Sequence, residues 1–212
     1  MKFDPKIQRG TISGVYVSIH STHDYKEPDY VFTRPVDQLE LTPAGIVGDR
    51  HYGHEAVAGG RDKKLYASGT VIRNYRQWSA VAAVDIQQID RNLSLESRLT
   101  AADLGANFQI DGLGSLSSIP AGAYVVVSPF ATDFQPKRSE DVVLQVYAQM
   151  APCRIAGAGL AQRFGRSDLA AQFPATAMEQ GLNYRGIRGT VEKGGVIRPG
   201  YTLWLLTPTG VD

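Results

Sequence analysis

Cys153 is the only cysteine in the 212-residue chain, and its neighbours could make it reactive. Residues 151–154 read APCR, and residues 155–164 have helical character. Proline is favoured at the first position of a helix, so Cys153 is expected in the first turn, beside backbone N–H groups and the positive end of the helix dipole. Such a site, with Arg154 adjacent, favours a thiolate that could attack, carry sulfur or bind a soft metal. Alternatively, Cys153 is a buried thiol that packs as a small hydrophobe.

A second group of polar residues stands in the glycine-punctuated segment 45–53 (GIVGDRHYG). Asp49, Arg50 and His51 together offer an acceptor, a fork of donors and a titratable imidazole. Because functional residues gather on loops and glycine lets the backbone approach a ligand, this segment is a candidate site. The alternative is a charged turn in which Asp49 and Arg50 bond to nearby backbone.

Arginines form the third group, and they suit a phosphorylated ligand. Arginine makes bidentate contacts with phosphate, and residues 183–189 (NYRGIRG) contribute Arg185 and Arg188. Near the helix that begins at Cys153, they could hold such a ligand at the helix N-terminus. Alternatively, each arginine is a solvated charge that one of the 21 acidic residues balances.

Two histidine pairs leave zinc as a weaker alternative. His20 with His23, and His51 with His54, have HxxH spacing, but neither has the helical HExxH pattern of a zinc enzyme. The sequence also lacks the GxGxxG and GxxxxGK[ST] nucleotide loops and the GxSxG nucleophile elbow.

Many short strands must position these groups. The clearest candidates, which alternate or are rich in β-branched residues, are residues 14–20, 124–128, 142–148, 186–191 and 201–206. Helices are expected at residues 85–91, with Asp85 as the cap and Ile86, Ile89 and Leu93 on one face, and at about residues 169–180. Residues 53–64 are expected to be a loop. Short strands joined by Gly/Pro turns predict a mostly β fold of the α+β class with peripheral helices, a distorted β-barrel. The length fits a single domain over residues 1–212, with its core at about 14–206.

Composition excludes several classes of protein. The net charge of +1 provides no strong field for nucleic acid or an anionic membrane, and no apolar run has the length of a membrane span. A lone cysteine forms no disulfide within the chain and fits a reducing compartment, so we expect a cytoplasmic protein without a signal peptide.

These pieces, in this order, resemble the MOSC family, which includes the C-terminal domain of molybdenum-cofactor sulfurases and stand-alone bacterial proteins. The matching segments are residues 45–53, like the family's Gly-Asp-Arg-His loop; 104–108 (LGANF), like its Gly-Glu-Asn-Leu strand entry; 151–153, like its Pro-Cys site; and 188–200, like its closing hairpin. The resemblance spans roughly residues 14–206. It implies a distorted β-barrel whose cysteine carries activated sulfur or ligates molybdenum in a pterin cofactor, and some relatives reduce N-hydroxylated compounds at that metal.

The resemblance implies roles for particular residues of this chain. Cys153 would be the catalytic residue and the metal ligand of a molybdenum cofactor (molybdopterin), and Asp49 and His51 would shape or protonate the site. The residues expected to bind the cofactor are Arg50, Arg154, Arg188 and Asn107. Ala106 stands where the family usually has an acid, so any role of that carboxylate is absent or moved.

Three functions remain open. The first is a molybdenum-dependent reductase of N-hydroxylated compounds, whose electrons would come from a separate donor protein because no reductase domain or iron–sulfur cysteines accompany the site. The second is a sulfur carrier that receives persulfide sulfur from a cysteine desulfurase and delivers it for cofactor or metal–sulfur cluster assembly. The third is a binding or structural barrel with an inert thiol.

Overall fold

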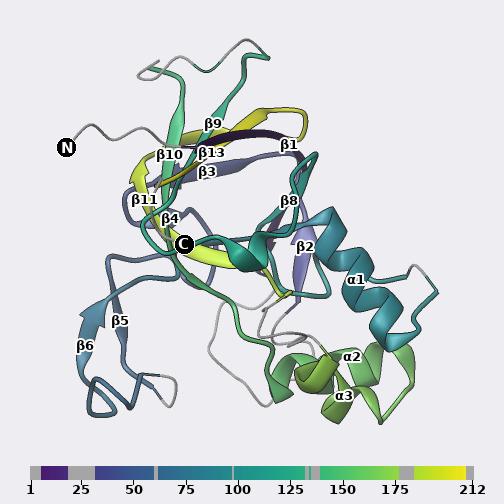
Figure 1. Cartoon of the computed structure of the whole chain (residues 1–212). Coiled ribbons are helices and arrows are strands. Elements are labelled where there is room, and N and C mark those ends of the chain that lie inside the picture. Colours follow the sequence, from purple (N-terminus) through teal and green to yellow (C-terminus); the bar gives the residue numbers. More distant parts are fainter. Residues whose placement is uncertain are drawn as a thin grey trace.

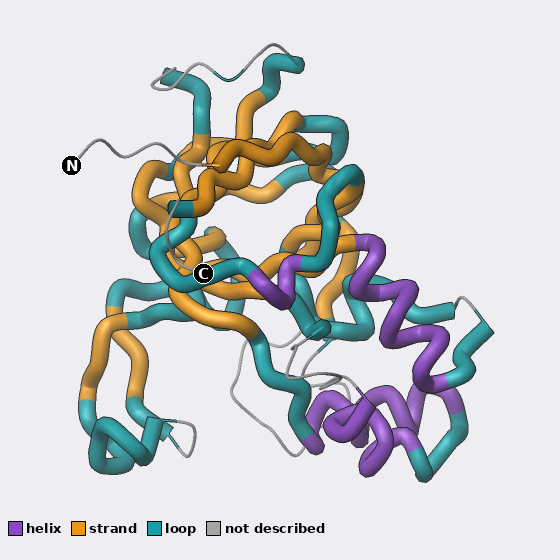
Figure 2. The backbone as a smooth tube through the Cα atoms, in the orientation of Figure 1, coloured by secondary structure: helices purple, strands orange, loops and turns teal. Residues whose placement is uncertain are grey.

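Strands dominate the residues that the computed structural model describes, which are 6–18, 32–59, 62–96, 98–131, 134, 139–176 and 184–208. In chain order the strands are β1 (Lys6–Ser18), β2 (Thr33–Pro35), β3 (Leu39–Thr42), β4 (Gly45–Ile46), β5 (Glu55–Val57), β6 (Val71–Arg73), β7 (Trp78–Ala82), β8 (Phe108–Asp111), β9 (Tyr124–Ser128), β10 (Val142–Gln149), β11 (Ile187–Lys193), β12 (Gly195–Ile197) and β13 (Thr202–Thr207). The helices are α1 (Ala83–Leu93), α2 (Arg154–Phe164) and α3 (Leu169–Thr176), with a 3₁₀ turn at Leu116–Ser118. Figure 2 shows the helices gathered to one side of the strands. The predicted mostly β class with peripheral helices is confirmed.

Seven strands close into a barrel (Figure 1). Neighbours hydrogen-bond in the order β13, β9, β10, β11, β7, β8 and β1, and β1 pairs with β13 to complete the ring. The pairs are antiparallel except for β7 and β8, which run parallel. The register shifts in β1 between Ile12 and Gly14 and twice along β10, which bends these strands. The predicted distorted β-barrel is therefore confirmed.

The barrel interior is filled by inward-facing side chains of alternating strand residues. In β9 and β10 these include Val125, Val127 and Leu144, all buried. Trp78 fills the space next to β11 and donates its indole N–H to the carbonyl of Thr190 at 2.9 Å, which satisfies its polar atom inside the core. The alternation that predicted these strands is the one that packs them.

A second core lies between the barrel and the helices. Helix α1 contributes Ile86, Ile89 and Leu93 from one face, and α3 contributes the fully buried Phe173. Gly157 belongs to this contact, because a Cβ there would lie 2.8 Å from the carbonyl oxygen of Ala170. Glycine therefore weakens α2 by itself but lets it approach α3 closely. The cluster also includes the half-buried Cys153, so this packing helps to fix the cysteine.

Two local expectations are wrong. Asp85 is not the cap of α1, because Ala82 is the N-cap and Asp85 lies in the first turn, where its Oδ2 accepts the N–H of Leu116 at 2.9 Å. Residues 53–64 are not simply a loop, because β5 forms there and pairs with β6. The helix predicted to extend to residue 180 is described only to Thr176, and the residues that follow lie outside the described part.

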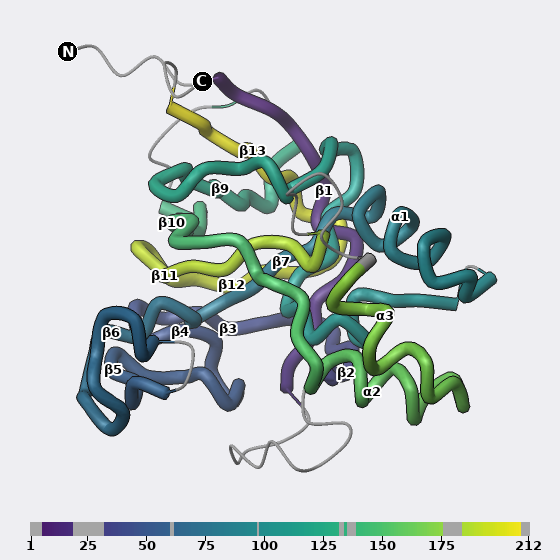
Figure 3. The backbone as a smooth tube through the Cα atoms, turned by 60° about the horizontal axis from the view of Figure 1, so that its bottom comes forward, coloured from purple at the N-terminus to yellow at the C-terminus, as the bar shows by residue number. Residues whose placement is uncertain are grey.

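Strands β5 and β6 form a hairpin that stands apart from the barrel. Two views separated by 60° show it projecting on the side away from the three helices (Figures 1 and 3). We call residues 54–74 the arm. Within the described residues, no helix combines the length and hydropathy needed to cross a bilayer.

Candidate functional site

One end of the barrel collects the ends of several strands. Ala80 of β7 pairs with both Phe108, the first residue of β8, and Ile187, the first residue of β11. Ile187 in turn pairs with Gln149, the last residue of β10. The segments that enter or leave these strands, including the one that runs from β10 to α2, therefore meet at this end (Figure 1).

Asp49 is the centre of a buried hydrogen-bond network. Its side chain is 2% exposed. Its Oδ2 accepts the backbone N–H of Ser18 at 2.9 Å and Nδ2 of Asn107 at 3.0 Å. Its Oδ1 accepts the backbone N–H of His51 at 2.9 Å and faces His51 Nδ1 at 3.2 Å. Gly48, with φ of +81°, makes the turn that directs Asp49 inward.

The network sets the charge states of Asp49 and His51. Burial by itself raises the pKa of Asp49, but the hydrogen bond and charge of His51 and the backbone N–H groups outweigh it and lower that pKa to about 2. Burial lowers the pKa of His51, the hydrogen bond to Asp49 opposes this, and the charge of Arg50 adds to the lowering. A neutral His51 that donates from Nδ1 to Asp49 has its lone pair on Nε2, in a ring that is 27% exposed.

Asn107 holds the network together. Its Nδ2 donates to the carbonyl of Tyr16 at 3.2 Å as well as to Asp49, and its Oδ1 accepts the backbone N–H and the hydroxyl of Ser79, both at 3.0 Å. These four bonds use both donors and both lone pairs of the amide. Asn107 thus joins β1, β7 and the Asp49 loop, an arrangement that positions Asp49.

Cys153 lies at the N-terminus of α2, which begins two residues later than predicted. It has extended dihedral angles (φ −139°, ψ 158°), so the helix begins at Arg154 and Cys153 is the N-cap, with Pro152 outside the helix. The carbonyl of Cys153 accepts the N–H of Gly157 at 3.0 Å. Its side chain makes no capping hydrogen bond to the helix, but the N-cap position is one at which the helix dipole favours negative charge.

Arg185 places a buried cation against the sulfur. Its guanidinium Nη1 lies 3.5 Å from Cys153 Sγ, and its Nε donates to the carbonyl of Leu104 at 3.1 Å. The residue is only 8% exposed. Because a nearby positive charge stabilises a thiolate most strongly where water is scarce, this contact adds to the effect of the helix terminus.

The other predicted arginines differ in exposure. Arg154 is exposed at the first residue of α2, and Arg50 is half-buried directly after Asp49. Arg188 is half-buried in β11, opposite Ser79 and Ala148, and its guanidinium lies 5.9 Å from the ring centre of Tyr147. Their assignment as cofactor-binding residues stays a prediction, as do the catalytic roles of Asp49, His51 and Cys153.

A short segment connects the two groups. Residues 104–107 begin with Leu104, which accepts the bond from Arg185, and end with Asn107, which binds Asp49. Between them Ala106 is fully buried. A carboxylate is absent at this position, and the cysteine group and the Asp49 network are therefore linked through three consecutive peptide bonds.

Sequence reasoning considered Arg185 as a phosphate ligand near the Cys153 helix but did not select it as a site residue or as a partner of the sulfur. Its importance follows from contacts with residues 81 and 32 positions away, which no local pattern reveals. Ser79 was missed for the same reason, since it orients Asn107 across 28 positions.

The zinc alternative gains no support from the described residues, among which no group of three or more His, Cys, Asp or Glu side chains is placed to hold a metal ion. His51 and His54 are described, whereas His20 and His23 lie outside the described part.

Comparison with known proteins identifies relatives of this fold. The MOSC domain model matches residues 49–203. YuaD of Bacillus subtilis, provisionally named as a metal-sulfur cluster biosynthesis protein, is 32% identical over 94 residues, which are 44% of this chain and 48% of that protein. The aligned segment therefore spans about half the length of this curated relative.

Solved structures match over more of the chain. The crystal structure of YuaD has a TM-score of 0.80 at 23% identity, over 96% of this chain and 99% of that one. The structure of YiiM from Escherichia coli has a TM-score of 0.54 at 18% identity, over 95% and 71% of the two chains. These likenesses show a shared fold.

Proposed function

The chain belongs to the MOSC domain family, and on this premise we propose that it is a sulfur carrier. Cys153 accepts a sulfane sulfur as a persulfide and passes it on for the assembly of a cofactor or a metal–sulfur cluster. The name of YuaD, which refers to metal-sulfur cluster biosynthesis, supports this class of acceptor.

The observation that carries the proposal is the buried guanidinium of Arg185 at 3.5 Å from Cys153 Sγ. A cation and a helix N-terminus together favour a thiolate, which is the form that attacks sulfur. A cysteine that only packs in the core would need neither the cation nor the helix N-terminus. The half-buried position leaves the sulfur within reach of a donor while it shields the product from water.

The transfer is a thiol exchange in which atoms and electrons balance. The Cys153 thiolate attacks the terminal sulfur of a donor persulfide, the S–S bond of the donor breaks, and the donor leaves as a thiolate. Cys153 then bears the –SSH group. Arg185 stabilises the anionic sulfur before and after the step.

We assign to Asp49 and His51 the handling of the proton. Asp49 holds the His51 ring with its proton on Nδ1, so Nε2 is the basic atom that this end of the barrel offers for the persulfide proton. Asn107 acts as a positioning residue, because its four hydrogen bonds keep Asp49 in place.

Intact mass tests the proposal. The wild type and Cys153→Ser are incubated with cysteine persulfide, desalted and weighed. The wild type should gain about 32 Da, one sulfur atom, which dithiothreitol removes. An adduct of the same size on Cys153→Ser, or no adduct on the wild type, would refute a carrier role for Cys153.

A second candidate is a molybdenum-cofactor protein with Cys153 as the metal ligand, and the donor set favours it. A thiolate is a ligand that molybdenum accepts, and the exposed Arg154 at the helix N-terminus and the half-buried Arg188 suit the cofactor's phosphate. Arg50 is the further candidate for this contact. The bound cofactor would supply the two-electron chemistry that reduces an N-hydroxylated substrate.

Elemental analysis separates the two candidates. Protein is expressed in a host that makes molybdenum cofactor, as the wild type and as Cys153→Ser. If the protein binds the cofactor through Cys153, we expect about one molybdenum atom per wild-type chain and none in the variant. If the protein is a sulfur carrier, we expect no molybdenum in either protein and the persulfide adduct in the wild type.

A further inference from the structure

The arm, residues 54–74, presents an apolar surface that the barrel does not cover. Among the described residues its two strands pair only with each other, from Glu55 opposite Arg73 to Val57 opposite Val71. Val57 and Val71 are 68% and 60% exposed, and Leu65 near the tip is 79% exposed. Val57 and Val71 are cross-strand neighbours, and exposed apolar side chains on a projecting element are typical of a protein-binding surface.

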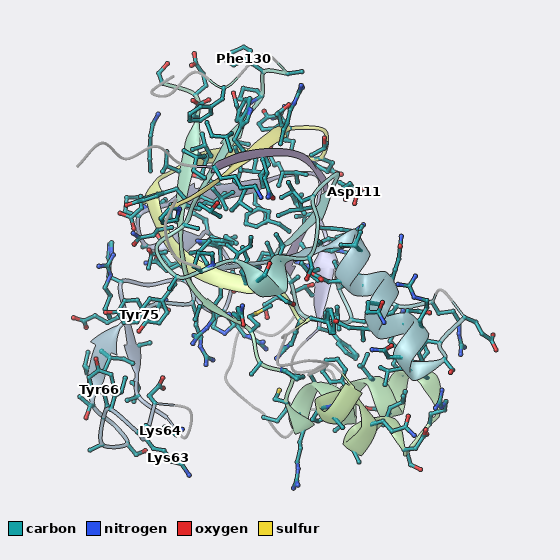
Figure 4. The ribbon with its side chains drawn as sticks, in the orientation of Figure 1. Lys63, Lys64, Tyr66, Tyr75, Asp111 and Phe130 are labelled. Carbon is teal, nitrogen blue, oxygen red and sulfur yellow. The ribbon has the colours of Figure 1, made fainter. Side chains whose placement is uncertain are left out.

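The tip of the arm carries two lysines and one aspartate in a hydrogen-bonded turn at residues 62–66. Asp62 fixes this turn, since its Oδ2 accepts the N–H of Gly59 at 3.0 Å and its carbonyl accepts the N–H groups of Leu65 and Tyr66 at 2.9 Å. Lys63 and Lys64 extend outward there, on the same end as Tyr66 (Figure 4). A surface with an apolar centre and two lysines fits an acidic partner surface.

The base of the arm is fastened to the candidate site. Asn74 donates from Nδ2 to the carbonyls of His51 at 2.7 Å and Gly53 at 2.9 Å. The adjacent Tyr75 stacks on Tyr147 of β10, with ring centres 3.9 Å apart. The arm is thus held against both the Asp49–His51 loop and the strand that leads to Cys153.

An open hollow of about 550 Å³ lies between the arm and β11. It is lined by Pro43, His54, Glu55, Val71, Ile72, Arg73, Val191 and Glu192. Val71 belongs both to this hollow and to the exposed apolar side chains of the arm, so a partner seated on the arm would also meet the hollow.

We propose that the arm docks the protein that delivers sulfur to Cys153, and that this donor meets the arm with an acidic surface that has an apolar centre. The inference rests on the proposed function. Because the base of the arm contacts the His51 loop and β10, the strand that leads to Cys153, docking at the arm brings the donor to these elements. The exposed valines and Leu65 supply the buried contact, and Lys63 and Lys64 steer the encounter.

The rate of sulfur loading, followed by intact mass, tests this docking. Two donors are compared: the purified cysteine desulfurases encoded in this protein's own genome, supplied with cysteine, and the small molecule cysteine persulfide. The arm variants are Val57→Thr/Val71→Thr/Leu65→Ser and Lys63→Glu/Lys64→Glu. The matched controls are Val84→Thr on α1 and Lys6→Glu on β1, both exposed and away from the arm.

We expect each arm variant to load from a desulfurase about tenfold more slowly than the wild type, with the control variants unchanged. The effect of the lysine reversal should fade in about 0.5 M NaCl, where exposed charges are screened. All variants should load from cysteine persulfide at the wild-type rate, which also shows that the site is correctly folded.

Other outcomes would refute either the docking proposal or the carrier function. If the arm variants load from a desulfurase as fast as the wild type, or if only the small molecule loads the wild type, the docking proposal is wrong and the carrier function stands. If no donor loads the wild type, the carrier function itself is wrong.

Discussion

The Asp49–Asn107 network and the Cys153–Arg185 pair lie at the same end of the barrel but are constructed differently. In the network, Asn107 uses every donor and acceptor of its amide, and both oxygens of Asp49 accept hydrogen bonds in a buried position. In the pair, the sulfur is half-buried, belongs to the N-cap residue of a helix and lies 3.5 Å from the guanidinium of Arg185.

The network positions the residues of the site, whereas the pair supplies the atom that reacts. Buried groups that are saturated with hydrogen bonds are costly to move, so the network fixes the loop that carries His51. The sulfur is half-buried and lies outside this network, so it can form a new S–S bond without breaking the network's hydrogen bonds. The same barrel end thus combines a rigid frame with a reactive atom.

Removal of the frame should have the largest effect. Asn107→Ala deletes four buried hydrogen bonds and leaves Ser79 and Asp49 without those partners, so we expect the free energy of unfolding to fall by about 3 kcal/mol. Urea denaturation measures this. Gln88→Ala, which removes a half-buried amide from α1, is the control and should change stability by less than about 0.5 kcal/mol. Equal effects of the two variants would show that the network is not a rigid frame.

Acid should have the second-largest effect on stability, because it protonates Asp49 at the centre of the hydrogen-bond network. The pKa of Asp49 is about 2 in the folded protein and near its usual 3.8 when unfolded, so its stabilisation is complete above about pH 4 and is lost as the pH falls toward 2. The shift corresponds to about 2 kcal/mol. The difference in unfolding free energy between the wild type and Asp49→Asn, measured from pH 5 to pH 2, should shrink across this window. A constant difference would contradict the assigned pKa.

Substitutions in the Cys153–Arg185 pair should change the reactivity of Cys153 more than the stability of the protein. Arg185→Gln removes the cation near the sulfur and should slow alkylation of Cys153 at pH 7 by about tenfold. Arg185→Lys keeps the charge and should retain most of the rate, even though both variants lose the bond to Leu104. If glutamine and lysine have the same effect, packing rather than charge determines the reactivity.

The smallest effect is expected at Arg154. It lies next to Cys153 but is exposed, so solvent screens its charge and Arg154→Ala should slow alkylation by only about twofold at low salt. The difference should disappear in about 0.5 M NaCl. An effect of Arg154→Ala as large as that of Arg185→Gln would reverse the assigned importance of the two arginines.

Local patterns predicted the fold better than they predicted the site. The β-branched run at residues 142–148 is β10 almost residue for residue, because its alternation is what packs the barrel. The glycine-rich loop and the Pro-Cys segment were recognised from residue types alone. Arg185 and β5 were not, since burial of Arg185 depends on Leu104, 81 positions away, and a three-residue strand exists only by pairing with β6.

The rate of alkylation of Cys153 by iodoacetamide at pH 7, in the native protein and in the same protein unfolded in urea, tests most directly whether the fold activates this cysteine. An activated thiolate should react faster in the native state, by about tenfold, despite its partial burial. A native rate below that of the unfolded chain would show an inert, packed thiol and would contradict the account.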